Sequence, residues 1–504
     1  MSEPNPKPTG AGRGVLYIAF AKFYFLFVGL AVQLFGLPRL LPKVEFGRFS
    51  MVNSIASWFN NVAVTGTIQT VSKFATRDPE KARAVQHAGL RMHVRLGLPI
   101  AVAFIAAAPG VAWLLGDPQK TMPLVLAGLI IGGYSFYAVF VGTANGLLQF
   151  HKQAGLDITF ATVRAAGLIG MAAAGLGVVG VIAGWVAAVV VILCVAIVWV
   201  GLPGKPADKL PVKPMWQFFT GVAGYLVLFN ALMFVDNFLL ERRLAIEFSA
   251  NRADEMNGAY TAVQNLARVS YQAIIAATFV VFPLVSSATF AEDRETTKRY
   301  IQITLRYSLI FATAIAIVMA ANPADVMRLL YPETYVEGAP ALVELALGYV
   351  AFAMFAIAGT ILNGAGRSRA AIVSAAITLA VAAIGNYIAI GIAAGGPHVL
   401  EVAATVTGSA MVVGAVITGY QLQRLFGATM PAASIARIAI AAAGAYAAGR
   451  FLPLHDRGKV MTLVAAAAVA VVFLVLLVAT RELGARDLEA IKAVRRKRAP
   501  GGET

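Results

Sequence analysis

The sequence predicts an all-α polytopic membrane protein with about fourteen transmembrane helices. Of its 504 residues, 59% are hydrophobic and only 13% are charged, whereas soluble proteins carry about 25% charged residues. The mean hydropathy of +0.75 also indicates a membrane protein. Apolar stretches of about 20 residues, the length at which a helix crosses the hydrocarbon core, recur along the whole chain.

The first apolar stretch is too long for the core of a signal peptide and lacks a small-residue cleavage site. We therefore expect it to remain as the first transmembrane helix. The fifth and sixth stretches meet at a glycine-rich turn, residues 175–180. The expected spans are residues 14–36, 49–71, 94–115, 122–146, 156–176, 178–200, 217–240, 259–283, 304–322, 341–363, 370–391, 400–420, 435–452 and 460–480.

This count divides the chain into five parts. They are a cytoplasmic tail (1–13), two six-helix bundles (14–210 and 211–425), two additional helices (426–480) and a basic cytoplasmic tail (481–504). Lys and Arg gather on one side when both termini are cytoplasmic, so the positive-inside rule favours that orientation. The net charge of +16 thus lies in short loops and a tail, and no nucleic-acid partner is expected.

A duplicated motif relates the two bundles. Gly47-Arg48-Phe49-Ser50 matches Gly258-Ala259-Tyr260-Thr261, and later pairs follow in the same order, including Gly142-Thr143 with Gly359-Thr360. Six helices per repeat is an even number, so both repeats enter the membrane from the same side. Parallel repeats of this kind are a transporter architecture, with the substrate path between the bundles.

Each copy of the motif opens a helix with a polar stripe, because residues four apart share one helix face. Such a stripe either joins helices by hydrogen bonds or lines a hydrated cavity. The number of polar residues on one face favours a cavity, in which amides and hydroxyls can bind sugar hydroxyls. The stripe residues are Asn53, Ser57, Asn61 and Thr65 in the first copy, continued by Gln69, and Tyr260, Gln264, Arg268 and Gln272 in the second.

Few ionisable residues lie inside the expected spans, and four of them are candidates for function: Lys22, Arg164, Asp236 and Arg268. A charge at mid-bilayer costs roughly 3 kcal/mol or more, so each should face protein or water. Arg268 lies deep in its helix among amides, and we expect it to contact the substrate; a structural pairing with Asp236 or a backbone carbonyl is the alternative. The three cations favour an anionic head group, since arginine binds phosphate bidentately.

The other three ionisable residues keep two interpretations each. Lys22 either lines the cavity or reaches back to the cytoplasmic interface, and Arg164 either lines the cavity or pairs with another helix. Asp236 lies near the outer end of its span, where an exposed interfacial charge is favoured; the alternative is a carboxylate that couples transport to protons or sodium. No catalytic group, metal site or cofactor is expected: none of the five histidines lies mid-span, Cys194 is the single cysteine, and no P-loop is present.

The residues Asp236–Leu240, Gly258–Leu266 and Phe282–Ser286 resemble the multidrug/oligosaccharidyl-lipid/polysaccharide (MOP) flippase superfamily, and its polysaccharide-biosynthesis (Wzx-type) branch in particular. The resemblance implies two six-helix bundles around a central cavity, often with two further helices. It implies a transporter, not an enzyme, that moves undecaprenyl-diphosphate-linked oligosaccharides to the outer leaflet for O-antigen, capsule or exopolysaccharide assembly. Implied partners are membrane lipids and the polymerase and chain-length machinery.

One departure from the family pattern concerns the arginine. Family members often carry Arg directly before the leucine at position 266, whereas this chain has Asn265 there and Arg268 further on. The head-group role of Arg268 is therefore inferred from its position deep in the span and from its place in the polar stripe. Lys22 resembles a basic residue on the first helix of related lipid flippases. Alternatives are a lipid II flippase, an ion-coupled multidrug exporter, and a membrane glycosyltransferase or ligase, for which the largest outer loop, Glu241–Asn257, is short.

Overall fold

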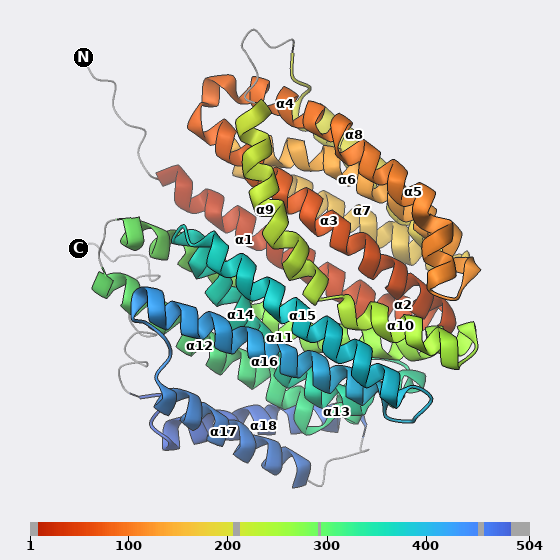
Figure 1. The fold of residues 1–504 in the computed structure, drawn as a ribbon, viewed down its shortest axis with the longest axis vertical. Helices are drawn as coiled ribbons and strands as arrows, with labels where there is room; N and C mark the ends of the chain where they lie inside the picture. The colour runs from red at the N-terminus through yellow and green to blue at the C-terminus, as the bar shows by residue number, and fades with distance from the viewer. Residues whose placement is uncertain (1–8, 205–211, 291–293, 452–457, 485–504) are drawn as a thin grey trace, which may run out of the picture. The chain divides into compact units, whose positions relative to one another are not determined.

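The computed structural model describes residues 9–204, 212–290, 294–451 and 458–484, in which helices are present and β-strands are not. Most of the expected basic tail lies outside these residues. The elements, shown in Figure 1, are α1 (Thr9–Leu30), the π-helix η1 (Ala31–Gly36), α2 (Leu37–Leu40), α3 (Lys43–Arg77), η2 (Pro79–Lys81), α4 (Ala82–Arg95), α5 (Gly97–Leu114), η3 (Pro118–Lys120), α6 (Thr121–Gly146), α7 (Phe150–Ala173), α8 (Gly177–Val200), α9 (Val212–Leu232), α10 (Val235–Glu247), α11 (Ala250–Phe290), α12 (Arg294–Ala321), α13 (Pro323–Leu330), η4 (Glu333–Gly338), α14 (Ala339–Gly364), α15 (Ser368–Ala393), α16 (Val399–Phe426), α17 (Ala432–Phe451) and α18 (Lys459–Ala479).

The all-α polytopic fold is confirmed. Each of the fourteen expected spans overlaps a helix of the described residues, but the seventh, 217–240, is broken at Met233–Phe234 between α9 and α10. The described part of the chain has 12 helical segments long and apolar enough to cross a membrane. The helices α3 and α11 are not among those 12 segments. They are the two that carry the polar stripes, which lower their average hydropathy.

The expected outer loop between Glu241 and Asn257 is wrong in its local structure. Helix α10 continues to Glu247 and α11 begins at Ala250, which leaves only Phe248 and Ser249 outside a helix. The physical reason is burial: Glu241 and Asp254 have no exposed surface. Each is satisfied by a cation, so the polar residues that suggested a loop are part of the packed interior.

One compact unit comprises residues 1–265, 330–341 and 371–410. Within it α3 packs along α6 and α9, and α7 packs along α1 and α8 (Figure 1). Gly142 and Gly146 of α6 lie directly against the backbone of Ile68 and Ser72 of α3. Small residues let two helix backbones approach closely, as in membrane proteins generally.

In the same unit, α3 and α11 cross at the two glycines of the duplicated motif. A Cβ added at Gly258 would lie 3.3 Å from the Cα of Gly47, and a Cβ added at Gly47 would clash with the backbone carbonyl of Asp254. Equivalent residues of two repeats touch each other where a local twofold axis passes between them. The crossing therefore supports the internal duplication inferred from the sequence.

A second compact unit comprises residues 266–329, 342–370 and 411–504. Its core joins α12 to α17 and α18 through the buried side chains of Ile317, Ile438 and Phe473. Glu482, which is almost fully buried, accepts a hydrogen bond from Arg306 Nε at 2.8 Å and lies 3.6 Å from Arg437. The two additional helices are thus fixed to α12 by apolar packing and by ion pairs.

Candidate functional site

Arg268 is buried on α11, in the second unit. Its Nε donates a hydrogen bond of 2.8 Å to the hydroxyl of Tyr349 on α14, and 9% of the residue is exposed. Tyr349 packs edge-on against Phe352, which also contacts Tyr271. This aromatic packing fixes the tyrosine hydroxyl and through it the direction of the guanidinium. Gln272, one turn further, has a buried Oε1 that no described side chain or backbone group satisfies.

Asp236 is buried in the first unit, so the exposed interfacial charge favoured from the sequence is wrong. Only 1% of the residue is exposed. Its Oδ2 accepts hydrogen bonds from Tyr260 at 2.7 Å and Gln264 at 2.9 Å on α11, and from Thr407 at 3.2 Å on α16. These donors replace water around the carboxylate, which is why it can lie inside the protein.

Two asparagines adjoin the residues that contact this carboxylate. Asn237 and Asn386 each have a buried Oδ1 without a donor among the described residues. Asn386 Nδ2 donates to Thr407 Oγ1 at 3.0 Å, and Thr407 in turn contacts Asp236. One carboxylate with amide and hydroxyl oxygens is the donor set that hard cations prefer. No cluster of three or more His, Cys, Asp or Glu with metal-binding geometry occurs in the described ranges.

The stripe on α3 is used in two ways. Asn61 Nδ2 donates to Asn230 Oδ1 of α9 at 2.9 Å, so this residue does join helices. Asn53 has a buried Oδ1 that lacks a donor from the described chain. Ser57 and Thr65 are half-buried on the same helix. The interhelical interpretation therefore applies to Asn61, while the cavity interpretation stays open for the other three.

Lys22 of α1 forms an ion pair of 2.8 Å with Asp157 of α7. The lysine side chain is 43% exposed and the carboxylate 10%. Asp157 escaped the sequence analysis because it lies at the first turn of its expected span, where a charge is unremarkable. The pair fixes Lys22 against α7 and leaves part of the lysine side chain accessible.

Arg164 of α7 stacks on Trp185 of α8, with its Cζ 4.2 Å from the ring centroid. It forms no ion pair with any carboxylate of the described segments, and its buried Nε has no acceptor there. The pairing between helices expected as one alternative is present, but as a cation–π contact. The positive charge itself stays without a counter-ion.

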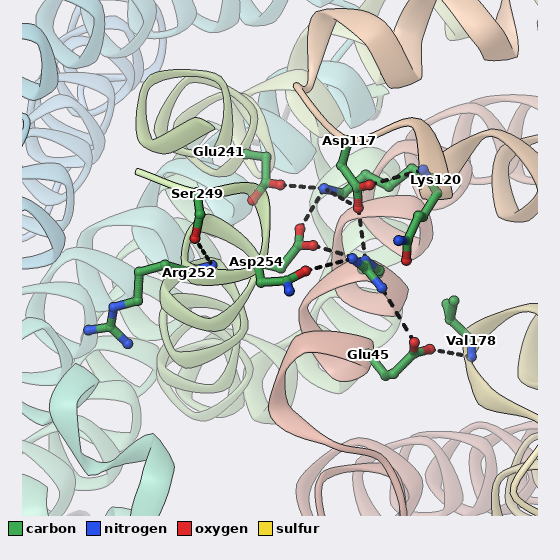
Figure 2. Close-up of polar contacts among 11 residues, drawn as sticks. Glu45, Asp117, Lys120, Val178, Glu241, Ser249, Arg252 and Asp254 are labelled. Atoms are coloured by element: carbon green, nitrogen blue, oxygen red, sulfur yellow. Dashed lines mark hydrogen bonds and ion pairs between the residues drawn. The ribbon is translucent and has the colours of Figure 1, made fainter. Parts of the chain in front are cut away.

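The sequence analysis missed a buried ionic cluster (Figure 2), here defined as Arg48, Asp117, Lys120, Glu241 and Asp254. Arg48 Nε donates to Asp117 at 2.8 Å and to Asp254 at 3.0 Å, and Lys120 Nζ donates to Glu241 at 2.7 Å and to Asp254. All five are at most 5% exposed. Arg48 directly follows the motif glycine, the only signal in the sequence that could have suggested a role.

The ionic cluster has three carboxylates for two cations, and this imbalance affects its acids. Burial and the neighbouring Glu241 raise the pKa of Asp254 to about 8, although Lys120 opposes the shift. Burial also acts to raise the pKa of Asp117, but Lys120, the amide of Gln119 and Arg48 together hold it below its usual value. The surplus negative charge is thus relieved at Asp254, the carboxylate that lies between both cations and Glu241.

A family described as "Polysaccharide biosynthesis protein" matches residues 37–340. No curated protein sequence matches the chain significantly. Among solved structures, the lipid II flippase MurJ in an inward closed conformation superposes with a TM-score of 0.73 at 12% identity, over 93% of this chain and 99% of MurJ.

Two further structures share the fold. An inward-facing multidrug resistance MATE family transporter of the MOP superfamily gives a TM-score of 0.59 at 15% identity, over 82% of this chain and 98% of its own. A MOP superfamily transporter from Pyrococcus furiosus, described as having a binding pocket of reverse polarity, gives 0.60 at 15% identity, over 82% and 96%. The chain belongs to the polysaccharide biosynthesis protein family, and its fold is that of the MOP superfamily of transporters.

Proposed function

We propose that the protein moves undecaprenyl-diphosphate-linked oligosaccharide repeat units from the cytoplasmic to the periplasmic leaflet of a bacterial inner membrane. The observation that carries the proposal is the family match across residues 37–340, which spans both copies of the duplicated motif. The O-antigen, capsule or exopolysaccharide polymerase and its chain-length machinery would then act on the delivered unit.

The physical need for such a protein is the cost of moving a sugar head group through lipid. Each hydroxyl that loses water without gaining a partner costs several kcal/mol. Polar stripes on two helices supply replacement partners: Asn53, Ser57 and Thr65 on α3, and Gln272 on α11. Alternating access, in which the two repeats rock about the site, exposes these residues to one side at a time.

The diphosphate needs cations. Arg268 is the first of them, because Tyr349 and its aromatic neighbours hold the guanidinium in one orientation. A preorganised arginine loses little side-chain entropy when it binds an anion bidentately. Lys22, partly accessible beside Asp157, and Arg164 supply two further positive charges.

Asp236 is the candidate for coupling to sodium or protons. Its carboxylate is contacted by Thr407 and by Tyr260 and Gln264 of the polar stripe. Asn386, which donates to Thr407, and Asn237, the next residue in the chain, each have a buried oxygen that could help to hold a desolvated cation. Movement of a cation at Asp236 would therefore be transmitted to α11, the helix that also carries Arg268.

A lipid II flippase uses the same chemistry with another head group, and the likeness to MurJ concerns the fold alone. Reconstitution in liposomes distinguishes a flippase for oligosaccharide repeat units from a lipid II flippase. Purified protein in liposomes should translocate a fluorescent undecaprenyl-diphosphate oligosaccharide of its own pathway, measured as dye made inaccessible to an external quencher. Equal transport of lipid II, or transport of a cationic drug in place of both, would contradict the proposal.

A further inference from the structure

A pocket in the first unit lies between α1 with η1, α3 and α7. The pocket is narrow and opens to the outside. Its wall is formed mainly by Phe25, Val28, Phe49 and Leu168, and its polar lining consists of Arg164 and Gln33. Gln33 belongs to the π-helix η1, a local distortion that often occurs at functional sites.

Arg164 brings an unneutralised charge to this pocket. Within the described residues its guanidinium contacts Trp185 and no carboxylate, and its Nε is buried without an acceptor. Lys22, by contrast, pairs with Asp157. Arg164 is half-buried, and a cation that is withdrawn from water without a counter-ion is unfavourable, so a bound anion would relieve the cost.

The remaining lining restricts what that anion can be. Apart from Arg164 and Gln33 the pocket is apolar, so a free, fully hydrated anion would lose its water without compensation. An anionic group attached to a hydrocarbon chain matches both the polar side of the pocket, formed by Arg164 and Gln33, and its apolar wall. Trp185 covers one face of the guanidinium, which leaves its edge for in-plane hydrogen bonds of the kind that phosphate accepts.

We propose that this pocket binds the phosphate–hydrocarbon junction of the lipid carrier, with phosphate oxygens on Arg164 and the first prenyl units against Phe25, Val28 and Leu168. The proposal deepens the proposed function and rests on it, because it names the part of the lipid-linked substrate that this pocket holds. Gln33 then donates to the second phosphate or to its bridging oxygen.

The test uses full-length protein in nanodiscs of zwitterionic phosphatidylcholine, titrated with undecaprenyl phosphate. Binding is measured as a change in tryptophan fluorescence, and Trp185→Phe should abolish the signal because Trp185 stacks on Arg164. Arg164→Gln should weaken binding about tenfold or more, the usual effect of losing a charge-assisted hydrogen bond. Arg424→Gln, the same change at an exposed position of α16, should leave it unchanged.

A second variant keeps the test valid if Arg164→Gln fails to fold. A Cβ at Gly29 would meet nothing within 4 Å, yet Gly29 lines the pocket. Gly29→Leu, whose Cβ is unobstructed, should therefore occupy part of the pocket and weaken binding while Arg164 stays in place. Wild-type affinity in both Arg164→Gln and Gly29→Leu would overturn the proposal.

Two comparison ligands separate the possible sources of the phosphate. Weaker binding of phosphatidylglycerol and no binding of inorganic phosphate are the expected results. Equal affinity for phosphatidylglycerol would assign the pocket to membrane phospholipid and overturn the proposal. Failure of the proposed function is recognised separately, as wild-type protein that does not translocate the lipid-linked oligosaccharide in liposomes, whatever Arg164→Gln does to binding.

Discussion

At the residue scale, Arg268 and Asp236 show how much can be predicted from the position of a residue within an expected span. Depth alone identified Arg268 as a buried group, and the structure supplies what the sequence lacked, the Tyr349 hydroxyl that orients it. For Asp236 the prediction of an exposed side chain is wrong, because it was based only on the position of the residue near the end of a span. Its donors come from α11 and α16, far along the chain, and no local pattern reveals them.

Substitution of Arg268 is the direct test of the head-group role. Arg268→Ala should abolish polysaccharide export with normal membrane insertion, because the diphosphate loses its oriented cation. Arg268→Lys should retain part of the export, since the charge remains while bidentate geometry is lost. Surface polysaccharide is the measurement, and Arg424→Ala is the matched control. Normal export by the alanine variant at normal expression would exclude the role.

Asp236→Asn tests coupling without disturbing shape. Asparagine keeps an acceptor for Tyr260 and Gln264 but removes the negative charge. Transport in liposomes should then no longer respond to an imposed sodium or proton gradient, and the unfolding temperature should change little. A gradient response equal to that of the wild type would show that the coupling group lies elsewhere.

At the element scale, the sequence predicted helices well and their ends poorly. Apolar length located the expected spans, because a membrane imposes one length on all of them, but it did not reveal the break at Met233–Phe234 inside the seventh. The polar segment 241–257 was misjudged as a loop, since its charges are satisfied by Lys120 and Arg48 from another part of the chain. Ion pairs between residues far apart in the chain cannot be predicted from the local sequence pattern.

The close crossing of α3 and α11 predicts how a substitution at Gly47 affects stability. A methyl group at Gly47 would overlap the carbonyl of Asp254, so Gly47→Ala should destabilise the protein by about 1–3 kcal/mol, as overpacking usually does. Thermal unfolding in detergent measures it. Gly221→Ala on α9, where a Cβ meets nothing within 4 Å, should unfold at or slightly above the wild-type temperature. A Gly47→Ala protein as stable as Gly221→Ala would argue against the close crossing.

At the scale of the whole molecule, the ionic cluster links stability to pH. Asp254 has its pKa raised from 3.8 to about 8, so the folded protein keeps a proton that the unfolded chain has already released. A group of this kind makes the folded state less stable as pH rises between these two values. The unfolding temperature should therefore fall from pH 7 to about pH 8 and level off above it.

The matched comparison is Asp254→Asn, which cannot titrate. The difference in unfolding temperature between wild type and this variant should change with pH, and Asp78→Asn, an exposed acid next to Lys81, should follow the wild type throughout. A constant difference between wild type and Asp254→Asn over this pH range would show that Asp254 does not hold the extra proton.

The family match, the duplicated motif and the oriented arginine lead to one central claim, the transfer of a lipid-linked oligosaccharide between leaflets. Deletion of the gene, followed by assay of surface polysaccharide and of lipid-linked intermediates, tests it most directly. The account predicts loss of polymer, with undecaprenyl-linked repeat units stranded on the cytoplasmic leaflet. Unchanged polymer together with new drug sensitivity would contradict it and make the protein an exporter.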